Sequence, residues 1–310
     1  MISPKPKYLV VIAGPTAVGK TTCSIQLAEQ FQTEIISADA RQFYREIPIG
    51  TAQPTKDEMH GIPHHFLSFL SVQDSYSAGI FEKEALQRLQ KIFAYHDVVI
   101  AVSGSGLYIQ ALCEGLMEVP TIAPGLRIML TTLLKERGLP YLTAWLAQKD
   151  PDYYNLVDLQ NPKRVIRALE ICLSTNIAYS TFRKHPPRGD RNFHIIKIGL
   201  IQEKTILHTR IDLRVDTMMA EGLLQEAEKV YHYKTANALQ TIGYKELFDY
   251  IDGKHSLAKA ISHIKAHTKQ YAKRQLTWFK KDKNISWFTP YDLPRISAYI
   301  RQIMLNLLEK

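Results

Sequence analysis

The 310-residue chain has few cysteines and no long apolar segment. Cys23, Cys113 and Cys172 lie far apart and form no C-x-x-C pair, which argues against a zinc site or a disulfide framework and fits a reducing compartment. No apolar run approaches the roughly 20 residues that a membrane-spanning helix needs. The short run Tyr8–Ala13 leads directly into a glycine-rich loop, so it predicts a strand and not a signal peptide. We therefore expect a cytoplasmic protein that has no membrane partner.

The overall composition is that of an ordinary globular protein. Hydrophobic residues make up 45% of the chain and charged residues 22%, which is enough to build a buried core. The formal net charge of +9 makes an anionic partner plausible, nucleic acid included. Many soluble proteins without such a partner are equally basic, so the charge alone does not choose between these alternatives.

Strand-like and helical segments alternate over the first hundred residues. Continuous apolar runs typical of buried strands occur at Tyr8–Ala13, Glu34–Ser37 and Val98–Val102, and Lys20–Phe31 has helical spacing. The order strand, glycine turn, helix, strand predicts a parallel α/β sheet. A further apolar run, Ile195–Leu200, is expected to return to that sheet.

The middle of the chain differs from both ends. Between Glu114 and about Pro187 strand-like runs are absent, prolines are frequent and helical spacing dominates. This predicts a helical insertion domain at 114–187 within an α/β core formed by 1–113 and 188–310. The last third of the chain is predicted to be mostly helical.

One stretch, IAGPTAVGKTT from Ile12 to Thr22, matches the phosphate-binding pattern G-x-x-x-x-G-K-[ST]. Its glycines let successive backbone N–H groups point inward at a helix N-terminus, where Lys20 adds a positive charge and the Thr21 hydroxyl can bind Mg²⁺. A chance match is disfavoured because a predicted strand precedes the pattern and a predicted helix follows it. The predicted phosphate site comprises Gly14, Pro15, Thr16, Ala17, Val18, Gly19, Lys20 and Thr21.

Two other stretches end at the same edge of the predicted sheet. Asp39 follows the second strand, where a carboxylate can bind Mg²⁺, act as a general base or simply cap the next segment, and Arg41 and Gln42 supply donors beside it. The third strand runs into VSGSGLY, where Ser105 can donate to a phosphate oxygen or belong to a structural turn. This strand lacks the acid with which many P-loop ATPases bind magnesium. That absence is a first indication that the protein is not a standard NTP hydrolase.

Basic residues also recur at helical spacing. Arg210 and Arg214 are four apart, and because two adjacent guanidinium groups repel unless an anion lies between them, this pair favours a phosphate site. Arg164 and Arg167, beside Lys163, fit phosphate contact and surface salt bridging equally well.

The segment from Lys254 to Lys283 has nine Lys or Arg residues and one acid. Three of its lysines, Lys265, Lys269 and Lys273, step by four along one face of a predicted helix. A solvated helix face is the common explanation of such a run, but the imbalance leads us to favour an anionic partner.

The segment GIPHHFLS contains adjacent histidines, His64 and His65. Neighbouring side chains on an extended segment point to opposite sides. We therefore predict a structural role for the pair and not a two-histidine metal site.

These stretches, taken in order, resemble the tRNA dimethylallyltransferase family, also called tRNA isopentenyltransferases. The resemblance extends from Tyr8 to about Phe288 and rests on ten motifs in the family's order. They are GPTAVGKT, ISADARQFY, IGTAQP, PHHFLS, YSAGIF, SGSGLY, RVIRALE, RIDLRVDTM, GYKEL and TKQYAKRQLTW.

The resemblance implies a transfer of the dimethylallyl group from dimethylallyl diphosphate to N6 of adenosine-37, in tRNAs that read codons starting with U. It implies a P-loop NTPase-like core, a helical insertion that grips the tRNA anticodon stem-loop, Mg²⁺ as the cofactor, and a monomeric protein. An assignment as an ATP-binding protein, drawn from the loop alone, would then name the wrong ligand.

The resemblance also assigns roles to residues. Asp39 would take the proton from N6, while Lys20, Arg214 and a magnesium ion near Thr21 neutralise the departing diphosphate. Arg210 would contact the diphosphate, and Ser105 would take part in catalysis. The expected tRNA contacts are Asp39, Ala40, Arg41, Gln42, Ser105, Arg127, Lys163, Arg164, Val165, Ile166 and Arg167.

The chain departs from the family pattern at six positions of these motifs. Ser105 replaces Thr and keeps the hydroxyl, and Lys269 replaces Arg and keeps the charge without the bidentate fork. Gln53 replaces Lys and Ser68 replaces Asp, so each removes a charge, and the sequence offers no physical reason for that pair. The other two are Ala40 for Ser and Ser103 for Gly.

Three other functions fit part of the pattern. The same transfer to a free adenine nucleotide is the nearest alternative, and the helical insertion and basic segments argue against it. A small-molecule kinase should have an adenine pocket and a lid, neither of which is identifiable in the sequence. A non-catalytic RNA-binding protein would account for the six departures.

Overall fold

The structure is a computed structural model that describes residues 5–117, 119, 122, 125–184 and 191–309. The chain forms two compact units, Met1–Cys113 with Arg191–Lys310, and Glu114–Asp190. The sequence-based boundary between residues 187 and 188 lies outside the described residues. Within the described residues, no helix is both long and apolar enough to cross a membrane.

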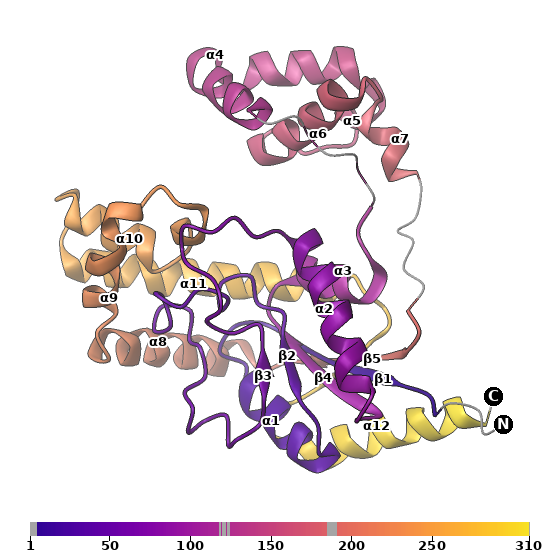
Figure 1. Cartoon of the computed structure of the whole chain (residues 1–310). Coiled ribbons are helices and arrows are strands. Elements are labelled where there is room, and N and C mark those ends of the chain that lie inside the picture. The colour runs from indigo at the N-terminus through magenta and orange to yellow at the C-terminus, as the bar shows by residue number, and fades with distance from the viewer. Residues whose placement is uncertain (1–4, 118, 120–121, 123–124, 185–190, 310) are drawn as a thin grey trace. The chain divides into compact units, whose positions relative to one another are not determined.

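The first unit is an α/β core around a six-stranded sheet whose strands are all parallel (Figure 1). The strand order is β3-β2-β4-β1-β5-β6. The strands are β1 (Tyr8–Ala13), β2 (Ile35–Ser37), β3 (His64–His65), β4 (Val98–Ser103), β5 (His194–Leu200) and β6 (Ile285–Phe288).

The helices of this unit cover both faces of the sheet, which is why its central strands are apolar throughout. Leu9 and Val11 of β1 pack in one core cluster, and Val10 and Ile12 pack in another on the opposite face. The helices are α1 (Lys20–Phe31), α2 (Ala78–Phe93), α3 (Gly106–Glu114), α8 (Lys204–Ala220), α9 (Leu223–Val230), α10 (Tyr244–Ile251), α11 (Leu257–Phe279) and α12 (Leu293–Leu308), with short 3₁₀ turns at Tyr231–Tyr233 and Asn237–Leu239.

The second unit is helical and has its own hydrophobic core. Leu130, Leu142 and Leu146 of one helix pack against Val165 and its neighbours on another. The long helix α4 is interrupted by non-helical backbone at Gly138, two residues before a proline. Its helices are α4 (Leu126–Lys149), α5 (Pro151–Tyr154), α6 (Pro162–Thr175) and α7 (Tyr179–Arg183).

The structure confirms the predicted parallel α/β core and adds two strands that the sequence did not indicate. β3 has two residues and β6 has four, and each pairs with a single neighbour at an edge of the sheet. The carboxyl ends of β1, β2 and β4 lie side by side, because Ala13 is in register with Ser103 and Ser37 with Val102. The segments that follow these three strands therefore meet at one edge.

Candidate active site

A cavity of about 460 Å³ opens at the carboxyl ends of β1, β2 and β4. Residues from the phosphate-binding loop, from the segments after β2 and β4, and from α8 and α11 line it. Six of the residues predicted to bind the diphosphate or to take part in catalysis share this lining, namely Thr16, Lys20, Thr21, Asp39, Ser105 and Arg214. Ala40, Arg41 and Gln42 line it as well.

The phosphate-binding loop has the backbone conformation that its sequence predicts. Gly14 and Gly19 have φ of +153° and +109°, and Ala17 is left-handed with φ of +62°. A Cβ on Gly14 would lie 2.7 Å from the carbonyl oxygen of Leu200, so only glycine fits there. The Lys20 ammonium group donates to the carbonyl oxygen of Pro15 over 2.8 Å, inside the curve of the loop.

Three cations gather around this loop. Burial lowers the pKa of Lys20 to about 7, with Asp39 opposing the shift and Arg214 adding to it. Burial also lowers the pKa of Arg214, and neighbouring Arg210 lowers it further. Arg210 lies within 4 Å of the position of a Cβ on Gly19 and donates to the Tyr291 hydroxyl over 2.7 Å. Cations packed this closely destabilise one another unless an anion joins them, so the site is suited to a highly charged anion.

Asp39 lies on the side of the cavity formed by the segment after β2. Its Oδ1 accepts a hydrogen bond from the backbone N–H of Arg41 over 3.0 Å. The backbone N–H of Ala40, one residue before Arg41, donates to Ser105 Oγ over 3.2 Å. This hydrogen bond joins the segment after β2 to the segment after β4. The Tyr271 hydroxyl of α11 hydrogen-bonds Ser105, and burial together with the charge of Asp39 raises the pKa of Tyr271 to about 12. A neutral phenol and a carboxylate therefore face the same part of the cavity.

A loop after β2 is held by hydrogen bonds to two polar side chains, Gln42 and Glu226. On the cavity side, Gln42 Nε2 donates to the carbonyl oxygens of Thr51 and Ala52 over 3.2 and 2.9 Å. On the far side, the buried carboxylate of Glu226 accepts the N–H groups of Ile49 and Gly50 over 2.9 and 2.8 Å.

The Glu226 carboxylate has a third donor, the buried hydroxyl of Tyr244. A Cβ on Gly50 would lie 2.3 Å from that hydroxyl oxygen, so only glycine allows this packing. Neither Glu226 nor Tyr244 was predicted as a functional residue. Their role is to fix the loop that holds Gln42 beside Asp39.

The two departures that each remove a charge are in direct contact. The Ser68 hydroxyl donates to Gln53 Oε1, and Gln53 Nε2 donates to the carbonyl oxygen of Tyr44 over 2.8 Å. In the family pattern these positions hold a lysine and an aspartate. The chain therefore has a neutral hydrogen-bonded pair where oppositely charged residues are expected.

This contact predicts coupling between the two positions. Ser68→Asp alone places a carboxylate against the Gln53 amide oxygen, and we expect it to lower the free energy of unfolding by about 1 kcal/mol. Gln53→Lys in the same chain should recover about 0.5–1 kcal/mol of that loss at low salt, and less at high salt, because the restored pair is exposed to screening. Urea denaturation of the parent, both single variants and the double variant measures the coupling. Additive effects would show that the two positions are independent.

The adjacent histidines of β3 have different surroundings. His65 Nε2 contacts Glu34 Oε2 over 2.5 Å, which agrees with the predicted structural role. His64 lines the cavity, and its Nδ1 contacts the carbonyl oxygen of Ile62 over 2.9 Å. Burial lowers the pKa of His64, which favours the neutral ring.

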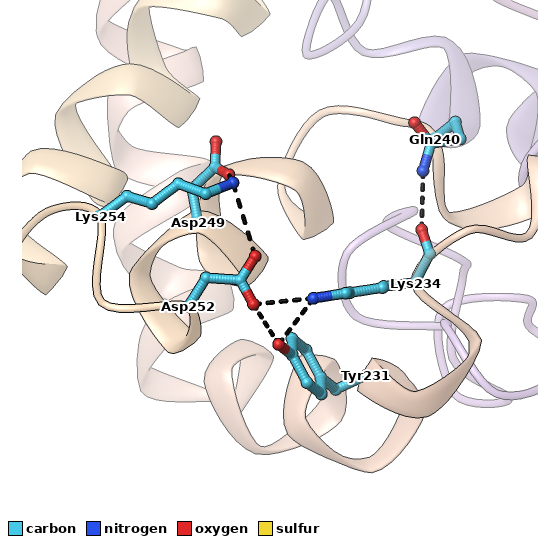
Figure 2. Close-up of polar contacts among 6 residues, drawn as sticks. All are labelled: Tyr231, Lys234, Gln240, Asp249, Asp252 and Lys254. Carbon is cyan, nitrogen blue, oxygen red and sulfur yellow. Dashed lines mark hydrogen bonds and ion pairs between the residues drawn. The ribbon is translucent and has the colours of Figure 1, made fainter.

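A polar network around Asp252 lies close to Gln240 (Figure 2). Asp252 accepts from Lys234 Nζ over 2.8 Å and from the Tyr231 hydroxyl, and Lys254 approaches its second oxygen at 3.5 Å. The hydrogen bond from Lys234 is the main reason that the pKa of Asp252 falls to about 2. Gln240, which lines the cavity, donates to the carbonyl oxygen of Lys234 over 2.7 Å, so the network fixes its side chain.

Part of the basic run of α11 is neutralised by acids of another helix. Lys265 and Lys269 contact Asp216 and Asp212 of α8, with the nearest N–O distances at 2.6 and 2.7 Å. The acids come from a different helix, so a count of charges within the run could not include them. Lys273, with Arg274 and Lys281, remains on the face that an anion can reach.

Some of the predicted tRNA-contacting residues of the second unit are exposed and others are buried. Lys163 and Arg164 are exposed on α6, whereas Val165 and Ile166 are buried in the core of the unit. The side chains of these two residues therefore stabilise the helix and do not offer a surface for RNA.

The buried carboxylate of Glu170 orients two arginines of this unit. Arg127 donates to both of its oxygens, over 2.5 and 2.6 Å, and Arg167 approaches it at 3.5 Å. Both guanidinium groups remain partly exposed, so they are fixed in position and still open to a phosphate.

The donor set of the cavity fits a magnesium ion that is shared with a phosphate ligand. Thr21 and Asp39 offer one hydroxyl and one carboxylate to the same cavity. Within the described residues there is no cluster of three His, Cys, Asp or Glu residues that could hold a metal by itself. Mg²⁺ is commonly held by one or two carboxylates together with substrate phosphates and water, so these residues suit it only with a ligand present.

Comparisons with known proteins identify relatives over nearly the whole chain. The model of the IPP transferase family matches residues 42–282. A tRNA dimethylallyltransferase of Christiangramia forsetii is 50% identical over 281 residues, covering 91% of this chain and 93% of the relative. A tRNA dimethylallyltransferase of Flavobacterium johnsoniae is 46% identical over 307 residues, covering 97% and 98%.

Solved structures show the same fold. The tRNA isopentenylpyrophosphate transferase of Bacillus halodurans has a TM-score of 0.73 and 34% identity, covering 98% of this chain and 100% of the other. A eukaryotic dimethylallyltransferase, described as acting on tRNA, has a TM-score of 0.79 and 29% identity, covering 96% of this chain and 78% of the other.

Proposed function

The chain belongs to the IPP transferase family, and we propose that it transfers a dimethylallyl group from dimethylallyl diphosphate to N6 of adenosine-37 in tRNAs that read codons starting with U. The observation that carries the proposal is the cavity at the sheet edge, where Asp39 faces a phosphate-binding loop that is surrounded by cations. A charged leaving group and a proton acceptor are the two things that this alkyl transfer requires. The protein would act as a monomer in the cytoplasm.

The reaction breaks the allylic C–O bond of the substrate and forms a bond from that carbon to N6. The diphosphate leaves with the electron pair of the C–O bond, and the loop N–H groups, Lys20 and Arg214 stabilise its charge. Asp39 accepts the proton that N6 loses on attack. A magnesium ion held by Thr21 and the diphosphate would offset part of the same negative charge. Because the exocyclic amine is a weak nucleophile, the position of the adenine contributes more than the basicity of Asp39.

The acceptor base must leave the stacked anticodon loop to reach this cavity. Arg127, Lys163, Arg164 and Arg167 are suited to hold the phosphates of the anticodon stem-loop while the base is extruded. The segment from Ala40 to Gln42, which lies beside Asp39, is suited to contact the extruded nucleotide.

The proposal is tested by incubating the protein with labelled dimethylallyl diphosphate, Mg²⁺ and either unmodified tRNA or AMP. We expect label in the tRNA alone, and none in a matched tRNA that carries guanosine at position 37. Label in AMP would favour the free-nucleotide transferase. The absence of label in both would favour a kinase or a non-catalytic RNA-binding protein.

A further inference from the structure

Gln275 of α11 joins the phosphate-binding loop to the end of β4. Its Oε1 accepts the backbone N–H of Thr16 over 2.9 Å, and its Nε2 donates to the carbonyl oxygen of Gly104 over 2.8 Å. The side chain is 5% exposed. One backbone N–H group of the loop is therefore occupied by a side chain of the protein.

The amide of Gln275 lies on the same side of the loop as the Lys20 ammonium group. A Cβ on Gly104 would be 2.3 Å from Gln275 Nε2 and 3.6 Å from Lys20 Nζ, so both nitrogens approach one point. In nucleoside triphosphate sites built on this loop, the lysine reaches the β- and γ-phosphates. Gln275 therefore occupies the side of the site where the outermost phosphate of a triphosphate would lie.

A third phosphate would have to displace a buried side chain there. The Gln275 amide already fills this space, with its Oε1 bonded to the Thr16 N–H and its Nε2 bonded to the Gly104 carbonyl oxygen. Rotating the amide by half a turn would place Oε1 against the carbonyl oxygen of Gly104, so that two acceptors would face each other. The buried amide is therefore fixed in place by its two hydrogen bonds, and it occupies the space that an additional phosphate would need.

The end of β4 points to the same conclusion from a different observation. Ser103 Oγ donates to the carbonyl oxygen of Ala38 over 2.6 Å and accepts the N–H of Ser105 over 2.7 Å. A hydroxyl engaged in the fold thus stands at the strand end where many P-loop ATPases have the acid that binds magnesium.

We propose that Gln275 determines the specificity of this loop by closing the position of a third phosphate, so that the loop accepts a diphosphate and rejects triphosphates. The diphosphate itself follows from the proposed function, on which this inference rests. The paired requirement for glycine at position 104 is part of the same arrangement, because any Cβ there would displace the Gln275 amide.

Inorganic diphosphate and inorganic triphosphate test the proposal without a nucleoside or a prenyl group. Their dissociation constants are measured by calorimetry at fixed Mg²⁺ for the parent, Gln275→Ala and Gln275→Ser. We expect both variants to bind triphosphate about tenfold more tightly than the parent, with the affinity for diphosphate changed by less than about threefold. Gln270→Ala, an exposed glutamine of the same helix, should behave as the parent does.

Three other results would contradict either the specificity role of Gln275 or the proposed function. An unchanged ratio of triphosphate to diphosphate affinity in both variants overturns the specificity role. Loss of both ligands in both variants shows that Gln275 only builds the loop, and overturns it as well. Failure of the parent to bind diphosphate contradicts the proposed function, and this inference with it.

Discussion

Asp39→Asn should lower the single-turnover rate of transfer to tRNA about a thousandfold, because a positioned general base contributes about 10²–10⁴ to such a step. Asparagine keeps an oxygen that can accept from the Arg41 N–H, so the segment after β2 should keep its conformation. The affinities for tRNA and for dimethylallyl diphosphate should therefore change little. Rapid-quench measurements with labelled dimethylallyl diphosphate give the rate, and filter binding gives the tRNA affinity.

A matched control is available at the opposite end of the strands, away from the cavity. Asp97 precedes β4, at the end of the strand far from the cavity, and contacts Lys7 over 2.8 Å. Asp97→Asn removes the same charge from an exposed position and should leave the rate unchanged. If Asp39→Asn transfers dimethylallyl groups within about threefold of the parent rate, Asp39 is not the base.

The parts of the fold that were predictable from the sequence are those with a strong local signal. β1 and α1 begin and end at the predicted residues, because a continuous apolar run and a glycine loop define both ends. β6 was missed because its four residues, ISWF, follow a lysine-rich helix end and become a strand only by pairing with β5. Edge pairing is a tertiary property, and a window of sequence does not contain it.

The residues of the site also divide into those with a local sequence signal and those that only tertiary contacts bring in. Lys20 and Thr21 belong to a local motif, but Gln275 contacts Thr16 across 259 positions of the chain. A signal for Gln275 was present, since it is a polar residue on the buried face of α11 that also holds Ala272 and Phe279. Buried polar residues usually need a partner, but the sequence alone cannot say which one.

The affinity for inorganic diphosphate should fall as the pH rises above about 7, and Lys20 is the reason. In the free protein, burial lowers the pKa of Lys20 to about 7, although Asp39 opposes the shift and Arg214 adds to it. A bound diphosphate places negative charge beside the ammonium group and raises its pKa. Above pH 7 the complex then holds a proton that the free protein has lost, so binding takes up a proton and weakens as pH rises, by up to about tenfold per unit.

Two substitutions separate this effect from the titration of diphosphate itself. Lys20→Arg keeps a cation that stays protonated throughout the range, so its pH profile contains only the contribution of the ligand and the other groups. Lys20→Met removes the charge and should bind diphosphate weakly at every pH. Calorimetry between pH 6.5 and about 9, in buffers with different ionisation enthalpies, should give a net proton uptake for the parent that exceeds the uptake for Lys20→Arg. Parallel profiles for the lysine and arginine proteins would mean that Lys20 is already charged in the free site, and that the surrounding anions, not burial, set its pKa.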